Sequence, residues 1–250
     1  MKSRFLTALP VYNEAAHITA VLDEVARYSP DVLVVDDGST DGTGEILRRR
    51  NDVHLITHGR NRGYGAGLKS AFDYAIEHGY EVLVTIDCDG QHQPKSIPEF
   101  VAACSDAVDM VSGSRYLRDF SGDSAAPADR RRINMQITDE LNQRFGLQLT
   151  DAFCGFKAYR VAALEKLDIT DPGYAMPLEL WVQAAHAGFR IVELPVHRIY
   201  LDESRSFGGA LDDSGTRLAY YHEVIDRAVD AITRKEADAR KSRLCRGSSG

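Results

Sequence analysis

The chain has 250 residues, 44% of them hydrophobic, and a formal net charge of −7 at pH 7. A chain of this length can bury a full hydrophobic core, and it fits one α/β domain. The acidic balance disfavours a general nucleic-acid binder or a protein that coats anionic membranes. No run of about 18 consecutive apolar residues occurs, so the sequence predicts no transmembrane helix.

The cysteines and the N-terminal residues indicate the cellular compartment in which the protein is expected. Cys88, Cys104, Cys154 and Cys245 show neither paired nor metal-type spacing, which suits free thiols in a reducing environment. Residues 1–10 contain too short an apolar run for a signal peptide. We therefore expect a cytoplasmic protein; peripheral attachment at the inner face of the membrane, directly or through a membrane partner, stays open.

Short apolar, β-branched runs alternate with polar, periodic segments over the first 115 residues. The runs predict strands at 5–9, 32–35, 53–57, 82–86 and 110–112, the first of them ended by Pro10. Helices are expected after Asn13, after Thr40 or Asp41 as far as about residue 50, after the glycine loop at 58–67, and after Pro94. This alternation predicts a mostly parallel sheet with helices on both faces.

The second half of the chain is less regular. Helices are predicted at 130–145, 177–187 and 218–241, the last followed by a frayed tail. Strands are predicted at 156–159 and at 191–196, where Pro195 indicates a position near the sheet edge. Polar loops should cover 117–127 and 201–213. No internal repeat or second-domain boundary is visible, so we expect a single α/β domain.

Two carboxylates follow the predicted strand at 82–86. Asp87 and Asp89 come directly after it, and Gln91 lies two residues further on. Open parallel sheets bind ligands beyond the carboxyl ends of their strands. Carboxylates spaced one residue apart can converge on one Mg²⁺ or Mn²⁺, which takes its remaining ligands from phosphate and water. Taken alone, an Asp-x-Asp pair is more often a solvated acidic turn.

Three other segments are expected at the same edge of the sheet. They are 9–14 after the first strand, 36–39 after the second, and the glycine-rich 63–67 with Lys69. A tyrosine ring can stack on a base, carboxylates can accept from base N–H or ribose hydroxyl groups, and glycine lets the backbone approach a bulky ligand. Each segment alone fits an ordinary turn or helix start, but acidic turns after three strands of one sheet together favour a ligand site.

Five short motifs occur in order along the chain. They are Pro-Val-Tyr-Asn-Glu at 10–14, Val-Val-Asp-Asp-Gly-Ser-Thr-Asp-Gly at 34–42, Asn-Arg-Gly-Tyr-Gly at 61–65, Asp-Cys-Asp-Gly-Gln at 87–91 and Gly-Ser-Arg at 113–115. This order resembles the family 2 glycosyltransferases of the GT-A fold. Over roughly residues 5–209 the chain is most similar to the catalytic domain of dolichol- or polyprenyl-phosphate mannose synthases.

The resemblance implies a domain organisation and a donor site. Residues 1–212 would form the GT-A domain, with a nucleotide-sugar-binding half at 1–115 and an acceptor half at 116–212, followed by a C-terminal helix and tail at 213–250. The metal ligands would be Asp87, Asp89 and Gln91, holding Mn²⁺ or Mg²⁺. Together with the edge residues above, the expected donor-binding residues are Pro10, Tyr12, Glu14, Val35, Asp37, Gly63, Lys69, Asp87, Cys88, Asp89, Gln91 and Arg115.

On the acceptor side, the resemblance implies phosphate contacts for Arg115 and for Arg131 or Arg132. Residues 151–160 match the floor of the acceptor site, and Glu179 matches a glutamate on the helix that follows. Two features depart from the family pattern. The late loop has Ser-Arg-Ser-Phe at 204–207 where such synthases carry a lysine, so that Arg205 would supply the charge, and C-terminal membrane helices are not seen.

The expected reaction is inverting transfer of mannose or glucose from GDP-mannose or UDP-glucose to an acceptor, with polyprenyl phosphate favoured. Asp89, Asp151, Arg115, Arg131 and Arg205 are the expected catalytic residues. A hydroxyl acceptor needs a general base, for which Asp151 is the candidate with Glu179 behind it, whereas a phosphate monoester is already ionised.

Three alternatives stay open from the sequence. One is transfer to a soluble or glycan hydroxyl, with Asp151 as the base. Another is a nucleotide-sugar-binding module without turnover. The third is a dinucleotide-dependent dehydrogenase, because glycines at 63, 65 and 67 precede a helix; its signal is weak, since the first glycine lies well past the strand that ends near Thr57.

Overall fold

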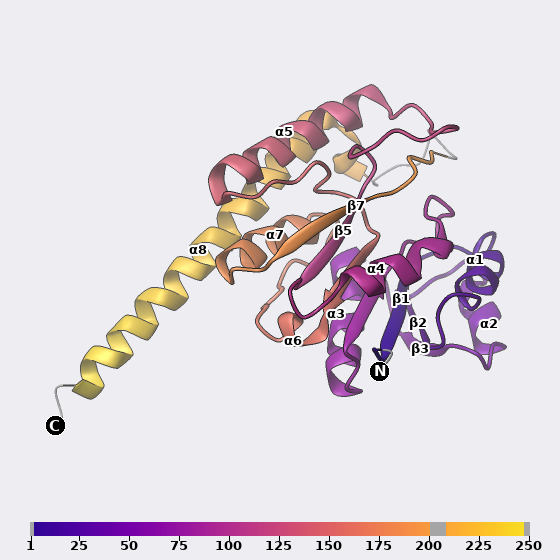
Figure 1. The fold of residues 1–250 in the computed structure, drawn as a ribbon, viewed down its shortest axis with the longest axis horizontal. Helices are drawn as coiled ribbons and strands as arrows, with labels where there is room; N and C mark the ends of the chain where they lie inside the picture. Colours follow the sequence, from indigo (N-terminus) through magenta and orange to yellow (C-terminus); the bar gives the residue numbers. More distant parts are fainter. Residues whose placement is uncertain (1–2, 201–208, 248–250) are drawn as a thin grey trace.

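The computed structural model describes residues 3–200 and 209–247, built around one seven-stranded sheet (Figure 1). The strand order is β3-β2-β1-β4-β6-β5-β7. β6 runs antiparallel to β4 and β5, and the other pairs are parallel. The strands are β1 Phe5–Val11, β2 Val32–Asp36, β3 His54–Thr57, β4 Val82–Thr85, β5 Met110–Ser114, β6 Lys157–Arg160 and β7 Ile191–Pro195. The predicted α/β class and mostly parallel sheet are confirmed.

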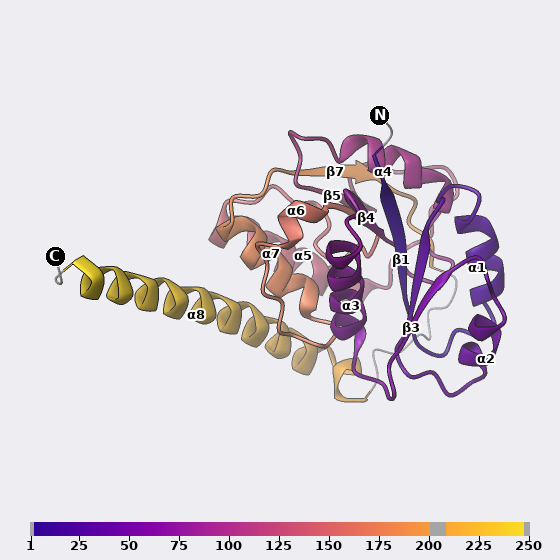
Figure 2. The ribbon, with the colours of Figure 1, turned by 90° about the horizontal axis from the view of Figure 1, so that it is seen from below.

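Helices cover both faces of the sheet (Figure 2). They are α1 Ile18–Val25, α2 Thr43–Arg48, α3 Tyr64–Glu77, α4 Ile97–Ala103, α5 Ala128–Phe145, α6 Val161–Leu164, α7 Met176–His186 and α8 Ser214–Gly247, with 3₁₀ turns at Pro94–Ser96 and Gly209–Asp212. In β2, Leu33 and Val35 pack into the cluster that includes α3 and α7, whereas Val32 and Val34 pack into the cluster that includes α1 and α4. Burial on both faces explains why this strand is an unbroken apolar run.

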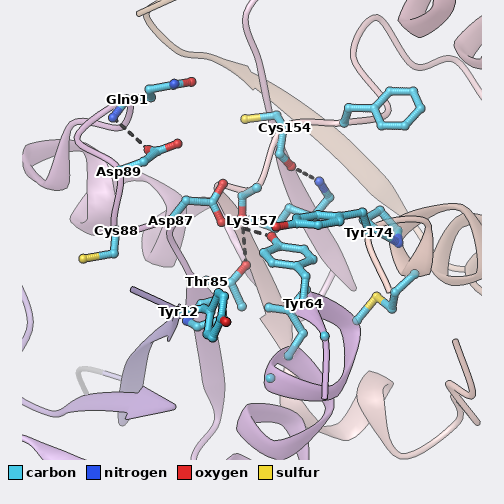
Figure 3. A pocket seen from close by; sticks show the side chains of 18 of the residues that line it. Tyr12, Tyr64, Thr85, Asp87, Cys88, Asp89, Gln91, Cys154, Lys157 and Tyr174 are labelled. Carbon is cyan, nitrogen blue, oxygen red and sulfur yellow. Dashed lines mark hydrogen bonds between the residues drawn. The ribbon is translucent and has the colours of Figure 1, made fainter. Parts of the chain in front are cut away.

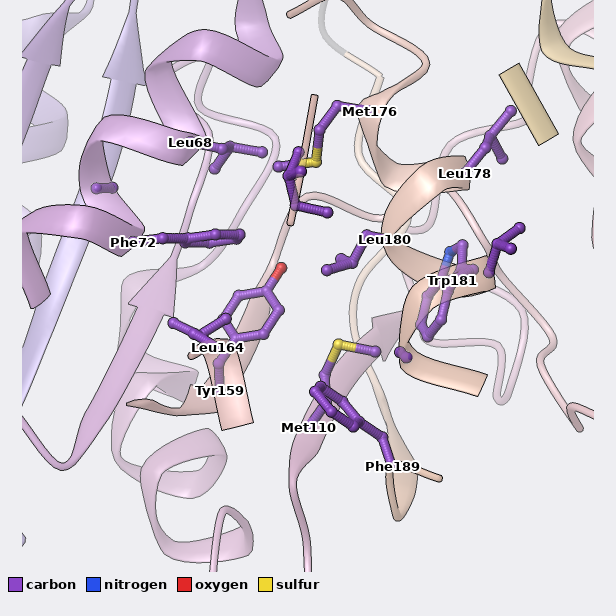
Figure 4. Close-up of a cluster of buried hydrophobic side chains, with 14 of the residues drawn as sticks. Leu68, Phe72, Met110, Tyr159, Leu164, Met176, Leu178, Leu180, Trp181 and Phe189 are labelled. Atoms are coloured by element: carbon purple, nitrogen blue, oxygen red, sulfur yellow. The ribbon is translucent and has the colours of Figure 1, made fainter. Parts of the chain in front are cut away.

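The larger cluster lies between β6 and helices α3 and α7 (Figure 4). Its largest member, Trp181 of α7, is fully buried, and its indole N–H donates to the carbonyl oxygen of Ala152 at 2.8 Å. Phe72 of α3 meets the ring of Tyr159 edge-on, with centroids 5.2 Å apart. These contacts fix α3 and α7 relative to the sheet.

Two local predictions were wrong near the start of the chain. β1 does not end before Pro10, because its pairing with β4 stops at Ala8, so no ladder bond on that side needs the missing N–H of Pro10. Asn13 does not cap α1, which begins at Ile18 without a side-chain cap. Asn13 instead adopts a positive φ of 57°, and its side-chain oxygen accepts from the Thr40 N–H at 2.8 Å, which joins the loops after β1 and β2.

Helix α8 is longer than the predicted 218–241 segment at both ends. It packs against α7 and α5 and keeps ion pairs with the domain as far as Lys235 and Glu236, while the end of the helix extends away from the rest of the domain (Figures 1 and 2). Arg227 of α8 pairs with the buried Asp171 at 2.6 Å, which anchors this helix to the loop before α7. Across residues 3–200 and 209–247, no helix combines the length and the apolar character needed to cross a membrane.

Strand β4 is central to the sheet, and its Leu83 is fully buried. We expect Leu83→Ala to lower the free energy of unfolding by about 2–5 kcal/mol, because the lost methyl groups leave a cavity. The matched control Leu117→Ala, at a position 44% exposed, should change it by less than about 0.5 kcal/mol. Urea unfolding followed by circular dichroism measures both, and equal values for the two variants would contradict the central position of β4 in the core.

Candidate functional site

A cleft of about 830 Å³ opens at the carboxyl ends of the first strands (Figure 3). Most of the predicted ligand-binding residues line it together. They are Pro10, Tyr12, Glu14, Asp37, Gly63, Asp87, Cys88, Asp89, Gln91 and Arg115. Because β2, β1, β4 and β6 are neighbours in that order, the groups they carry follow one another along the cleft.

Asp37 forms the end of the cleft that lies beyond β2. It accepts hydrogen bonds from the backbone N–H groups of Arg62 and Gly63, at 3.0 and 2.7 Å. His58 Nδ1 donates to the same carboxylate at 2.5 Å, and its Nε2 contacts Ser70 Oγ at 2.9 Å. The sequence did not single out His58 or Ser70; together they hold Asp37 and the 61–63 loop in one geometry.

Asp87 occupies the middle of the cleft. Tyr64 Oη donates to Oδ1 at 3.0 Å, and His92 Nε2 contacts Oδ2 at 3.2 Å. Gly155 packs so closely that a Cβ there would lie 2.1 Å from Oδ2. Burial alone would raise the pKa of Asp87, but the hydrogen bonds from His92 and Tyr64 outweigh it, so that the pKa is lower than usual and the group is ionised at neutral pH.

Asp89 and Gln91 stand beside Asp87 on the loop after β4. Asp89 Oδ1 accepts from the Gln91 N–H at 3.0 Å, and both side chains line the cleft. Within residues 3–200 and 209–247, no three His, Cys, Asp or Glu side chains converge on one point. Two carboxylates and an amide oxygen still form a hard oxygen donor set, which suits Mg²⁺ or Mn²⁺ when a diphosphate supplies further ligands. The residues present therefore fit the metal that the sequence predicted.

The far end of the cleft contains a buried ion pair between Arg115 and Asp151. Arg115 Nε and Nη2 donate to the two carboxylate oxygens at 2.7 and 2.9 Å. Burial would raise the pKa of Asp151, but the Arg115 charge and hydrogen bonds outweigh it and lower the pKa. Asp151 does not line the cleft, and both of its oxygens are committed to Arg115. This geometry does not fit the predicted general base.

Glu179, predicted to stand behind that base, also has a different position. It is buried, and it accepts from the backbone N–H groups of Thr170 and Asp171 at 2.9 and 2.7 Å. These hydrogen bonds hold the loop before α7 against the start of that helix. Glu179 does not line the cleft.

Several other predicted residues lie outside the cleft lining. Val35 is a core residue of β2, and Lys69 is exposed on α3, where it pairs with Asp73 at 3.1 Å. Arg131 stacks over the Tyr116 ring, 3.6 Å from its centroid. Arg132 is exposed and lies 3.7 Å from Asp129 of the same helix. Arg205 lies outside the described residues.

Helical phase explains which of the three consecutive arginines faces the cleft. In α5, Ile133 and Ile137 point into the core, whereas Arg130 and Asn134, also four residues apart, line the cleft. The four-residue spacing of Arg130 and Asn134 is visible in the sequence, but the family resemblance implied Arg131 or Arg132 as the acceptor contact.

The glycines of the 63–67 segment do not form a dinucleotide-binding turn. A Cβ at Gly63 would lie 2.3 Å from the Pro172 carbonyl oxygen, and a Cβ at Gly65 would lie 2.3 Å from that of Asp171. Gly63 also has a positive φ of 103°. These glycines therefore let the loop before α7 pack on the start of α3, which accounts for them without a dehydrogenase.

The buried ion pair generates a stability prediction. Arg115→Met should lower the free energy of unfolding by about 3–5 kcal/mol at pH 7, because the buried Asp151 loses its counter-charge. The control Arg132→Met removes an exposed pair and should cost less than about 1 kcal/mol. Since the pKa of Asp151 is depressed in the folded protein, the stabilisation is present at neutral pH and is lost as the pH falls through that pKa. A difference between Arg115→Met and wild type that grows on acidification would contradict this account.

Solved structures with the same fold include nucleotide-sugar transferases. Glucosyl-3-phosphoglycerate synthase of M. tuberculosis superposes with a TM-score of 0.68 at 20% identity, covering 90% of this chain and 80% of that one. A second structure of that enzyme, in complex with Mn²⁺, UDP and glucosyl-3-phosphoglycerate, gives a TM-score of 0.65 at 19% identity, with the same coverage. At this identity the likeness shows a shared GT-A fold.

Sequence relatives identify the family. The chain is 34% identical over 205 residues to the polyprenol monophosphomannose synthase of Mycolicibacterium smegmatis, covering 77% of this chain and 76% of the relative. It is 35% identical over 224 residues to the undecaprenyl-phosphate mannosyltransferase of Micrococcus luteus, covering 84% and 90%. The sequence profile of Glycosyl transferase family 2 matches residues 7–168. The motifs, the fold and these matches agree: the chain belongs to glycosyl transferase family 2.

Proposed function

We propose that this protein transfers mannose from GDP-mannose to a polyprenyl phosphate, with inversion at the anomeric carbon. The observation that carries the proposal is the order of groups along the cleft. Asp37 lies beyond β2 and the Asp87–Asp89–Gln91 set follows β4, which lies two strands along in the sheet. The cations Arg115, Arg130 and Lys157 line the same cleft, and Lys157 is in register with Thr85 at the end of β4. The mannosyltransferase relatives at 34% and 35% identity support the choice of sugar and acceptor.

The nucleoside would bind between the ends of β1 and β2. Tyr12 offers a 44% exposed ring for stacking, and Pro10 and Glu14 line the same part of the cleft. Asp37 acts here mainly by holding the 61–63 loop, since its oxygens already accept from two backbone N–H groups. The diphosphate would then lie over the loop after β4.

The leaving diphosphate develops negative charge as the glycosidic bond breaks. Asp89 and Gln91, with Asp87 beside them, would hold Mn²⁺ or Mg²⁺, which supplies a Lewis acid for that charge when bound. Tyr64 and His92 fix the Asp87 carboxylate, so that its position needs no rearrangement when the donor arrives. Cys88 contributes the backbone between the two carboxylates.

The acceptor end favours an anion over a hydroxyl. Asp151, the predicted base, is held by Arg115, and the charged side chains that line this end within the described residues are Arg115, Arg130 and Lys157. A phosphate monoester is ionised at neutral pH and attacks without a general base. Arg205, which lies outside the described residues, stays a proposed contact. Transfer to a glycan hydroxyl is the alternative outcome of the assay below.

We also propose that residues 1–115 bind the donor and residues 116–212 the acceptor, with Tyr221 of α8 adding to the acceptor end. A polyprenyl acceptor resides in a membrane, so the protein would work as a cytoplasmic enzyme that attaches peripherally to the inner face. GDP-mannose would come from the cytoplasm, which agrees with this location.

The proposal is tested by incubating the protein with GDP-mannose, Mn²⁺ and undecaprenyl phosphate and measuring the mannosyl lipid by mass spectrometry. Asp89→Asn should lower the transfer rate by about 10²–10³-fold, because a preorganised group that stabilises the leaving charge is lost. The control Asp73→Asn alters an exposed carboxylate on α3 and should leave the rate within about twofold of wild type. Full activity of Asp89→Asn would contradict the metal assignment, and product only with a glycan acceptor would contradict the lipid acceptor.

Gly155 gives a second prediction for the same site. Gly155→Ala should reduce transfer by at least about tenfold, because its Cβ would displace the Asp87 carboxylate. In Gly59→Ala the new Cβ meets nothing within 4 Å, so this variant should retain wild-type activity. The transfer rates of both variants are measured in the mannosyl-lipid assay described above. Thermal unfolding first establishes that the two variants are equally stable. Normal activity of Gly155→Ala would show that the position of Asp87 tolerates displacement.

A further inference from the structure

Tyr174 is an aromatic residue of the cleft wall that keeps 47% of its surface exposed. It lies in the loop before α7, and its ring stacks on that of Tyr64, with centroids 5.9 Å apart and 14° between the planes (Figure 3). Neither the sequence motifs nor the family resemblance singled it out. A lone exposed ring on an outer surface is ordinary, but a ring that lines a cleft is placed to contact a ligand.

The loop that carries Tyr174 is fixed by two other parts of the fold. The carbonyl oxygen of Pro172 accepts from a backbone N–H of α3 at 3.1 Å. The buried carboxylate of Asp171 accepts from the Gly173 N–H at 2.8 Å and from Arg227 of α8 at 2.6 Å. The backbone on either side of the ring is therefore held before a ligand arrives, and a ring held in advance loses little conformational freedom on binding.

The stacked pair of rings lies next to the carboxylates after β4. Tyr64 Oη donates to Asp87 Oδ1 at 3.0 Å, so that one ring separates Tyr174 from this carboxylate. In a nucleoside diphosphate sugar, the hexose is bonded to the phosphate that lies farther from the nucleoside. With the nucleoside at β1 and β2 and the diphosphate over the loop after β4, the hexose would lie beyond that loop, on the side of the two stacked rings.

The two exposed tyrosines of the cleft belong to different parts of it. Tyr12 follows β1, where the nucleoside would bind, whereas Tyr174 precedes α7. A hexose has apolar C–H groups on its ring faces and hydroxyl groups at its edge. A tyrosine offers the matching surface, because its ring is apolar and its hydroxyl is polar.

We propose that Tyr174 is the surface on which the hexose of the donor stacks, with C–H groups of the sugar against the tyrosine ring. The inference rests on the proposed function and names a residue that recognises the transferred sugar. Such a contact is present with the nucleotide-sugar and lost once the sugar has been transferred, so it favours the donor over the nucleoside diphosphate product. The hydrocarbon of a lipid acceptor is the competing occupant of this position, and the experiment below separates the two.

The experiment measures the Kd of GDP-mannose and of GDP, each with Mn²⁺ and without acceptor, by isothermal titration calorimetry. The variants are Tyr174→Ala, Tyr174→Leu, Tyr174→Phe and, for comparison, Tyr12→Ala. The matched control Leu117→Ala changes a side chain that is 44% exposed and lies outside the lining of this cleft. Thermal unfolding establishes that each variant is folded.

Tyr174→Ala should raise the Kd of GDP-mannose by about fivefold, which is about 1 kcal/mol, and leave that of GDP within about twofold of wild type. Tyr174→Leu, which keeps an apolar side chain without a ring, should show the same selective loss. Tyr174→Phe keeps the ring and should bind both ligands as wild type does. Tyr12→Ala should weaken both ligands by the same factor, and Leu117→Ala should weaken neither.

Three results would overturn the inference. The first is an equal Kd for GDP-mannose in wild type and in the two ringless variants of Tyr174. The second is an equal loss of affinity for GDP in those variants, which would assign the ring to the nucleotide. The third is an unchanged donor Kd with a raised acceptor KM in the transfer assay, which would assign the ring to the lipid.

The proposed function fails by a different result. Wild type that binds neither GDP-mannose nor GDP, or that binds them and forms no mannosyl lipid, would contradict the proposed function. Wild type that forms mannosyl lipid while its donor Kd is unaffected by loss of the Tyr174 ring would overturn the inference alone.

Discussion

The carboxylate of Asp87 is the point at which four segments of the chain meet. Strand β4 delivers it, Tyr64 reaches it from α3, His92 returns from the loop after β4, and Gly155 packs against it from the segment before β6. An ionised group that is largely enclosed by protein is stable only when its oxygens accept hydrogen bonds, and the segments that carry Tyr64 and His92 supply them. The donor side and the acceptor side of the cleft are thereby set relative to each other.

A second buried charge fixes the other end of the cleft. Asp151 accepts from Nε and Nη2 of Arg115 through both of its oxygens, and this bidentate pair fixes the orientation of the guanidinium. Between these two carboxylates lies Lys157, whose amine has a single described acceptor. The protein compensates Asp151 with a bidentate cation, whereas Asp87 and Lys157 both line the cleft.

The sequence predicted the sheet, its alternation with helices and the carboxylates after β4 because these depend on local patterns. Strand ends carry polar residues where ligands bind, and this rule brought Tyr12, Asp37 and Asp89 together correctly. The prediction failed where side-chain direction decides the outcome. Arg130 lines the cleft and Arg131 does not, because the two side chains leave helix α5 in different directions. Asp151 forms an ion pair with Arg115, which lies 36 residues earlier in the chain. Lys157 was missed because its burial follows from α7 packing over β6, a contact between distant segments.

Helix α8 belongs to the functional domain, although it follows the last strand of the sheet. Tyr221 forms part of the cleft wall, and Arg227 reaches Asp171 in the loop that packs on the start of α3. A truncation after the last strand would therefore remove a side of the binding chamber and also release the loop that steadies Tyr64. The helix keeps its contacts as far as Lys235, which pairs with Asp168 of the same loop, and Glu236, which pairs with His186 of α7. A purification tag or fluorophore should therefore be attached beyond these residues, where it would stand clear of the substrates.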